Sequence, residues 1–127
     1  MWSKRPTNLG VKDGRLAACP ASPNCVCTQA DDVEHRIDAI RFTGSKAEAM
    51  AKLKRAVATL PRTAIVAESM DYLHVECTSL IFRFVDDVEF WIDEPNQTIQ
   101  FRSASRVGHS DFGVNRKRME ALRRAFT

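Results

Sequence analysis

One amphipathic segment followed by four strand-like segments most constrains the fold. In SKAEAMAKLKRAVATLPR, Ser45 and Glu48 have the spacing of a capping box, apolar residues recur at helical spacing from Ala49 to Leu60, and Pro61 ends the pattern. The next segments, TAIVAES, YLHVECTS, LIFRFVDDVEFWID and TIQFRSAS, are rich in β-branched and aromatic residues and are separated by turn-forming residues. This order predicts one helix and then an antiparallel sheet.

Two further segments complete the expected order of elements. HRIDAIRF, residues 35–42, alternates in a way that suits a short strand. Near the end of the chain, Asn115 is a suitable helix N-cap, and Met119, Leu122 and Phe126 lie on one helical face. The order β-α-β-β-β-β-α predicts an α+β fold: one two-layer domain in which an antiparallel sheet of about five strands carries two helices packed on one face.

The beginning of the chain has a different composition. Residues 1–34 hold three of the five prolines, two of the five glycines and three of the four cysteines. Proline restricts its own backbone and that of the preceding residue, so this stretch favours an irregular arm over a helix. The whole chain of 127 residues has the length of one domain. We therefore expect a Pro/Cys-rich N-terminal arm at residues 1–34, packed on a single α+β domain at residues 35–127.

Composition indicates an ordinary globular protein. Hydrophobic residues make up 44% and charged residues 28%, and no apolar run approaches the ~20 residues that span a bilayer. The first residues contain no apolar stretch of signal-peptide length. We expect a soluble protein without a transmembrane segment, cytoplasmic on the chain as given, and exported or membrane-attached if a further N-terminal segment was removed. An acidic middle at residues 64–101, between basic ends, favours charge pairing inside the molecule.

The longest strand-like segment, LIFRFVDDVEFWID, poses a question of direction. A two-residue reversal at Asp86 and Asp87 would mix its apolar and polar faces, so either the reversal has an odd number of residues or the strand bends without reversing. A bulge or bend at these two residues keeps the apolar face intact and places the Asp86 carboxylate at the edge of the apolar layer. We favour the bend. The apolar residues of shared parity are Leu80, Phe82, Phe84, Val88, Phe90 and Ile92.

Three cysteines lie close together in CPASPNCVCTQ. Cys19, Cys25 and Cys27 have spacings unlike the C-x2-4-C pairs of structural zinc sites, so no metal is expected. A bridge between Cys19 and Cys25 would close a seven-residue loop in an oxidising compartment. Free or part-buried thiols in a proline-stiffened turn are the other interpretation, and the spacing alone leaves both open.

Acidic residues and a histidine occupy the middle strands. His74 and Glu76 share a strand face, which suits acid-base partners or metal ligands and suits a solvated face still better. Asp86, Asp87 and Glu89 could perform acid-base chemistry or hold a hard cation. Ion pairing across neighbouring strands is the preferred interpretation of these three acids. Their candidate partners are Arg83, Arg102 and Arg106.

The segment RSASRVGHSDFGVNRKR is the densest polar stretch. The backbone at Gly108 and Gly113 and the start of the last helix could receive a carboxylate or phosphate. A self-bonded loop before a capped helix fits equally well. No G-x-S-x-G elbow supports a hydrolytic triad, and the basic helix lacks the aromatics of a nucleic-acid surface. The candidate ligand-binding residues here are Arg102, Ser103, Ser105, Arg106, His109, Ser110, Asp111, Asn115 and Arg116.

The stretches LGVKDGRLAACPASPNCVCTQA, FRFVDDVEF and RSASRVGHSDFGVNRKRMEALR resemble, in matching order from Leu9 to Arg124, the domain-of-unknown-function family 1499. The resemblance carries no established activity, and it implies that the three stretches share one surface. Family members typically have serine in place of Cys27, which argues further against a three-thiol site. Some members resemble exported or membrane-attached proteins, which keeps a bridge between Cys19 and Cys25 open.

The preferred hypothesis is a non-enzymatic binding or scaffolding module without a cofactor. Its partner would be an anionic small molecule or a peptide, bound where the arm meets the VDDVEF strand and the SRVGHSDFGVNRKR loop. The alternative is a hydrolase or metal-assisted enzyme that uses Asp86, Asp87, Glu89 and His109. A third hypothesis, an interaction module on the sheet face without helices, predicts an exposed apolar patch and oligomers. The oligomeric state itself is left open.

Overall fold

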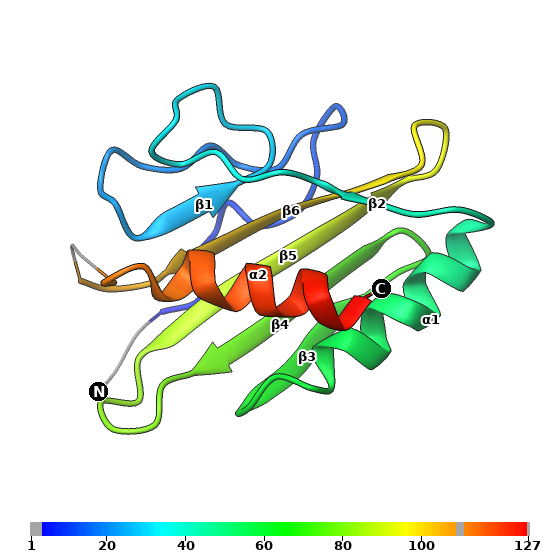
Figure 1. Ribbon diagram of the computed structural model, residues 1–127. Coiled ribbons are helices and arrows are strands. Elements are labelled where there is room, and N and C mark those ends of the chain that lie inside the picture. Colours follow the sequence, from blue (N-terminus) through cyan, green and yellow to red (C-terminus); the bar gives the residue numbers. More distant parts are fainter. Residues whose placement is uncertain (1–3, 109–110, 127) are drawn as a thin grey trace.

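Six strands form one antiparallel sheet, and two helices cover one of its faces (Figure 1). The computed structural model describes residues 4–108 and 111–126. The strand order is β1-β6-β5-β4-β3, and β2 also pairs with β6. In chain order the elements are β1 (Cys25–Cys27), β2 (Ile40–Arg41), α1 (Lys46–Val57), β3 (Thr63–Glu68), β4 (Tyr72–Thr78), β5 (Val85–Asp93), β6 (Thr98–Ser105) and α2 (Val114–Phe126).

The α+β prediction is confirmed, with one strand more than expected. The additional strand is β1, which comes from the arm and pairs antiparallel with β6. Its three residues are too few to show a period in the sequence. Of the strand expected at 35–42, only Ile40 and Arg41 pair with β6. Earlier in that segment the backbone follows β1 instead, because the N–H of Cys27 donates to the carbonyl of His35 at 2.8 Å.

Helix α1 begins at the capping box that the sequence predicts. The Ser45 hydroxyl accepts a hydrogen bond from the N–H of Glu48 at 3.1 Å, and the Glu48 carboxylate accepts one from the N–H of Ser45 at 2.9 Å. Gly44 precedes the cap at φ +96°, and a Cβ there would lie 2.8 Å from that carboxylate. The positive φ favours glycine at this position, and a larger residue would also displace the Glu48 carboxylate. The helix buries Ala49, Met50, Leu53, Ala56 and Val57.

Helix α2 is capped by Asp111, so the prediction of Asn115 as its N-cap is wrong. The Asp111 carboxylate accepts hydrogen bonds from the N–H groups of Gly113 at 2.8 Å and Asn115 at 3.0 Å. Asn115 lies inside the first turn, and its fully buried side chain bonds to the sheet and to Asp111. The buried apolar residues of α2 are Met119, Leu122 and Phe126, as predicted.

The core lies between the sheet and the two helices. Phe90 of β5 and Phe101 of β6 meet at its centre, with ring centroids 6.3 Å apart. Both rings are almost completely buried, and a buried phenylalanine is worth about 3 kcal/mol or more against alanine. The other apolar side chains of this core cluster with at most 1% exposure are Leu53, Ala56, Leu73, Val75, Val88, Ile99, Met119 and Leu122.

The segment before Asp86 is a hairpin loop, not the first half of a long strand. Strand β4 reverses between Thr78 and Val85, which are register partners. The reversal is closed by a hydrogen bond from the N–H of Ser79 to the carbonyl of Phe84 at 2.9 Å. Strand β5 then continues through both aspartates with uninterrupted pairing to β4 and β6. The expected bend at Asp86 is therefore wrong, because the chain reverses earlier, but Asp86 does lie at the edge of the apolar layer.

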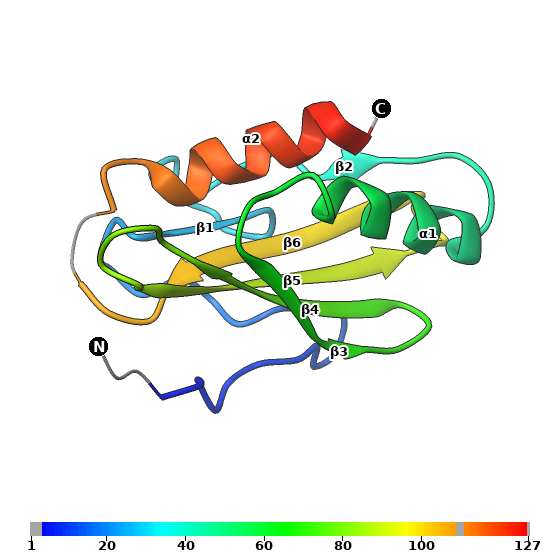
Figure 2. The same ribbon diagram turned by 90° about the horizontal axis from the view of Figure 1, so that it is seen from below.

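The arm covers the sheet face that the helices leave open (Figure 2). Near its start, Arg5 forms an ion pair with Glu76 of β4 at 2.7 Å. Further along, the N–H of Gly10 donates to the carboxylate of Glu89 in β5 at 2.6 Å. The sheet is therefore enclosed on both sides by different parts of the chain. Among the described residues, neither helix has the length and apolar character needed to cross a membrane.

Candidate functional site

The sheet face under the arm, which we call the arm face, carries a row of polar and charged side chains. Neighbouring strands place them side by side, because Glu76 is the register partner of Asp87, and Glu89 is the partner of both His74 and Arg102. Paired residues of an antiparallel sheet point to the same side. The ionisable members of this row are Tyr72, His74, Glu76, Asp87, Glu89 and Arg102.

Arg106 neutralises the acids at one end of the arm face. Its guanidinium donates to both oxygens of Asp87 at 2.8 and 2.9 Å and to Glu76 at 2.6 Å. His74 donates to the same Asp87 carboxylate at 2.8 Å. Burial acts to raise the pKa of Asp87, but the hydrogen bonds from Arg106 and His74 outweigh it and hold this pKa below its usual value. Asp87 therefore stays ionised.

The same cluster is the one group of three potential metal ligands among residues 4–108 and 111–126. Ligand atoms of His74, Glu76 and Asp87 all lie within 4.8 Å of one another. Both carboxylates already bind Arg106, so a metal ion would have to displace that guanidinium. The expectation of a solvated face at His74 is wrong: its exposure is only 2%, because the arm covers it.

Two buried polar groups lie at the other end of the arm face. Glu89 is fully buried, and one of its oxygens accepts hydrogen bonds from the Tyr72 hydroxyl at 2.5 Å and from the N–H of Gly10. Burial and this carboxylate raise the pKa of Tyr72, so the phenol keeps its proton. Arg102 donates to the carbonyl of Ala18 in the arm at 3.3 Å. Within the described part of the chain, Oε1 of Glu89 and Nε of Arg102 have no hydrogen-bond partner.

Asp86 belongs to a different network, under helix α2. It forms an ion pair with Arg118 at 2.8 Å, and Arg118 also donates to the side chain of Asn115 at 2.9 Å. The Ser103 hydroxyl donates to the same side-chain oxygen of Asn115 at 2.6 Å. The Asn115 amide donates to the Ser105 hydroxyl, the Asp111 carboxylate and the carbonyl of Asn24. These side chains hold α2, β6 and the arm together.

The structure thus divides the predicted site residues between two faces. Asp87, Glu89, Arg102 and Arg106 belong to the arm face and its end, whereas Asp86, Ser103, Ser105, Asp111 and Asn115 meet under α2. Arg116 lies apart from both groups, where its guanidinium donates to the carbonyls of Glu34 and Arg36. His109 and Ser110 lie outside the described residues.

Sequence reasoning did not assign Arg118 to any site. One usable signal is its position three residues after Asn115 and four before Leu122, which places it beside the buried side of α2. A charged residue at the border of an apolar helix face needs a partner in the sheet, and Asp86 is that partner.

Cys19 and Cys25 form a disulfide. This pairing removes two of the three thiols that a zinc site in this segment would need. Cys27 and Cys77 are free and buried. Burial raises the pKa of the Cys27 thiol, and it raises the pKa of the Cys77 thiol to about 11. Both thiols are therefore protonated and unreactive near neutral pH.

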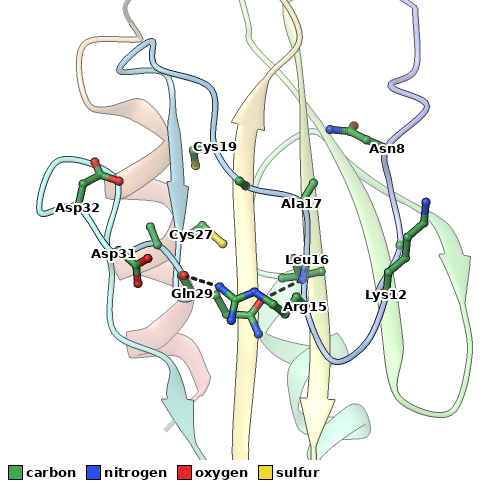
Figure 3. Close-up of a pocket in the computed structure, with 13 residues that line it drawn as sticks. Asn8, Lys12, Arg15, Leu16, Ala17, Cys19, Cys27, Gln29, Asp31 and Asp32 are labelled. Carbon is green, nitrogen blue, oxygen red and sulfur yellow. Dashed lines mark hydrogen bonds between the residues drawn. The ribbon is translucent and has the colours of Figure 1, made fainter.

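A cavity of about 510 Å³ lies within the arm, between the segment before β1 and the segment that follows β1 (Figure 3). Arg15 contributes to its wall and donates to the carbonyl of Gln29 at 3.1 Å. The Gln29 side chain accepts a hydrogen bond from the N–H of Leu16 at 2.8 Å. These two hydrogen bonds join the chain before β1 to the chain after it in the cavity wall. The other lining residues are Asn8, Gly10, Lys12, Ala17, Ala18, Cys19, Cys27, Ala30, Asp31 and Asp32.

Sequence reasoning did not single out the charged residues of this cavity. Lys12 and Arg15 precede β1, and Asp31 and Asp32 follow it. Nothing in their spacing indicates that the chain before β1 lies against the chain that follows β1. The cavity also adjoins the arm face, because two of its lining residues, Gly10 and Ala18, bond to Glu89 and Arg102.

Comparison with known proteins identifies a family. Residues 15–126 match the family model described as protein of unknown function (DUF1499). Neither the comparison with curated proteins nor that with solved structures gave a match. Because the matched residues cover nearly the whole chain, the protein belongs to the DUF1499 family.

Proposed function

We propose that the protein is a non-enzymatic binding module for a small anionic molecule, and that the cavity within the arm is its binding site. One observation carries this proposal: Lys12 and Arg15 line the cavity, and no carboxylate of residues 4–108 and 111–126 forms an ion pair with either of them. Both side chains are exposed, so an anionic ligand could reach them and accept charge-assisted hydrogen bonds. The cavity volume of about 510 Å³ is in the range of small-molecule sites.

The acidic groups near the cavity restrict the ligand further. Asp32 is engaged, because its carboxylate accepts a hydrogen bond from His35 at 2.5 Å. Asp31 lies on the opposite side of the cavity from Lys12 in Figure 3. In Figure 3 the side chains of Lys12 and Arg15 point to different parts of the cavity, so a ligand with an anionic group near each cation, and a hydrogen-bond donor toward Asp31, matches this distribution. We propose that Arg102 and Glu89, beneath the arm, support this site through Ala18 and Gly10.

The segment SRVGHSDFGVNRKR supports an anion site less well than the cavity does. Arg106 is already bound to two carboxylates, and Arg116 is bound to two backbone carbonyls. Asp111 and Asn115 hydrogen-bond to each other at 2.7 Å. A ligand there would have to replace these internal bonds.

The alternative of a hydrolase or metal-assisted enzyme has less support. Asp86 points to the helix face, whereas Asp87 and Glu89 point to the arm face, so the three acids do not converge. Arg106 and His74 hold Asp87 in its ionised form, which suits a structural ion pair better than a proton donor.

Ligand titration tests the proposed function. The oxidised protein is titrated with inorganic phosphate and with small mono- and dicarboxylates, and binding is followed by calorimetry and by the melting temperature. We expect saturable binding of a carboxylate, weakened about tenfold or more in the Arg15→Gln and Lys12→Met variants, because each loses one charge-assisted contact.

Lys4→Met is the matched control, because Lys4 is an exposed arm residue that does not line the cavity. It should bind like the unmodified protein. The absence of binding by every probe, or equal binding by all three variants, would contradict the proposal.

A further inference from the structure

The hairpin loop between β4 and β5, residues 79–84, exposes a group of large apolar side chains. Leu80, Ile81 and Phe82 are 66%, 79% and 67% exposed, and Phe84 is 38% exposed. These are four of the nine exposed large apolar residues in the described part of the chain. Exposed apolar residues that occur singly need no explanation, but a contiguous group marks an interaction surface.

The loop has a defined structure that holds these side chains outward. Hydrogen bonds close its base in both directions: the N–H of Ser79 donates to the carbonyl of Phe84, and the N–H of Phe84 donates to the Ser79 hydroxyl, each at 2.9 Å. The rings of Phe82 and Phe84 stack with their centroids 5.5 Å apart. Arg83 between them has φ +59°, the left-handed conformation of a tight turn. The apolar group is therefore presented on a small, ordered projection.

A second loop adds apolar surface at the same end of the molecule. The N–H of Arg106 donates to the carbonyl of Val85 at 3.2 Å, so the chain leaves β6 beside the point where the hairpin joins β5. In Figures 1 and 2 the hairpin and the beginning of α2 lie at this same end of the molecule. Phe112 and Val114, at the beginning of α2, are 88% and 46% exposed.

The charge around the hairpin is positive. Arg83 lies among the apolar residues, and Arg62 is attached to the hairpin base through a hydrogen bond to the carbonyl of Thr78 at 2.9 Å. The acids that flank the hairpin in sequence are Glu76 and Asp86, and both are bound to arginines. The projection therefore combines apolar side chains with cations that no hairpin carboxylate neutralises.

We propose that this hairpin docks on an anionic lipid surface. Its apolar side chains would enter the boundary between headgroups and acyl chains, while the guanidinium of Arg83 stays among the phosphates. A convex projection of apolar and cationic residues matches a fluid, negatively charged surface, whereas a protein partner would need a groove of the same shape. The hairpin surface is separate from the cavity. The lipid-binding proposal can therefore be tested independently of the anion-binding proposal.

Vesicle sedimentation tests this proposal. The full chain is mixed with vesicles of phosphatidylcholine alone or with added phosphatidylglycerol. We expect binding to the anionic vesicles that decreases with salt, and a loss of about tenfold or more in the Ile81→Ser/Phe82→Ser double variant. Arg83→Gln should reduce the preference for anionic vesicles. Met70→Ser is the matched control: Met70 is 76% exposed in the turn after β3, and its loss should change nothing.

All four proteins should melt alike, because the altered side chains lie outside the core. Failure of the unmodified chain to bind either vesicle, or equal binding by the double variant, would overturn the proposal. A concentration-dependent dimer that the double variant abolishes, without vesicle binding, would also overturn it and would assign the hairpin to contact with a second copy.

Discussion

At the scale of single residues, two of the buried carboxylates of this protein are held by arginines. Asp86 meets Arg118 under helix α2, and Asp87 meets Arg106 on the arm face. A buried charge that loses its partner typically costs about 3 to 5 kcal/mol of stability. The pairs therefore limit which substitutions the fold tolerates, and they engage Asp86 and Asp87, two of the residues that the sequence suggests as catalytic.

His35 gives the protein a pH-dependent contact in the arm. Its ring donates to the carbonyl of Ser22 at 2.8 Å and to the Asp32 carboxylate. The hydrogen bond to Ser22, followed by the one to Asp32, raises the pKa of His35 above its usual value of about 6.5. A raised pKa in the folded state adds stability below the unfolded value, and this stability is lost as the pH rises through the folded value.

We expect the melting temperature of the unmodified protein to fall relative to that of His35→Gln as the pH rises from about 6.5 through the raised pKa. Calorimetry across this range measures the difference between the two proteins, which removes the contribution of other titrating groups. Parallel curves for the two proteins would show that His35 does not carry this dependence.

At the scale of elements, what the sequence predicts depends on the length of each periodic pattern. The helix at Lys46–Val57 and the strand at Thr98–Ser105 follow from patterns several residues long, and both are present. The alternation of Leu80, Phe82 and Phe84 continues the pattern of β5, although these residues form the loop. Periodicity records which residues are apolar, and it does not record where the chain reverses.

Prediction of the candidate site from the sequence has the same limitation. The sequence identifies Asp87 and Arg106 as charges that need partners. It does not indicate that the arm covers the sheet, so it places His74 in solvent and gives no sign of the cavity that Lys12 and Arg15 line. Contacts between the arm and the strands join residues far apart in the chain, and they follow from tertiary packing.

The disulfide between Cys19 and Cys25 fixes the arm where it becomes strand β1. It closes a loop of seven residues, for which the chain-entropy model gives about 2 kcal/mol. We expect reduction by dithiothreitol to lower the free energy of unfolding in urea by this amount. The Cys19→Ser/Cys25→Ser variant should equal the reduced protein, whereas an unchanged urea midpoint after reduction would contradict the estimate.

At the scale of the whole molecule, the arm contributes to the fold in two unequal ways. Its first part lies over the arm face, whose charged groups water could solvate if that part were absent. Its second part supplies β1, the apolar side chain of Val26 in the core, and the carbonyl of Asn24 that Asn115 binds. The division into an arm at 1–34 and a domain at 35–127 stays a prediction.

Two truncations test that division. We expect a chain that begins at residue 17 to melt cooperatively at a reduced temperature. A chain that begins at residue 35 should lose its cooperative transition, because β6 and Asn115 lose their partners in the arm. Calorimetry of both chains measures this, and cooperative melting of residues 35–127 would show that the domain is self-sufficient.

The opposite orientation of Asp86 and Asp87 also bears on how the sheet assembles. If β5 slipped by one residue against its neighbours, every side chain would change face. Glu89 would then enter the layer that contains Phe101, and Asp86 would separate from Arg118. An unpaired carboxylate in an apolar layer is strongly unfavourable. The charged residues of β5 therefore favour the native strand register and disfavour pairings that are shifted by one residue.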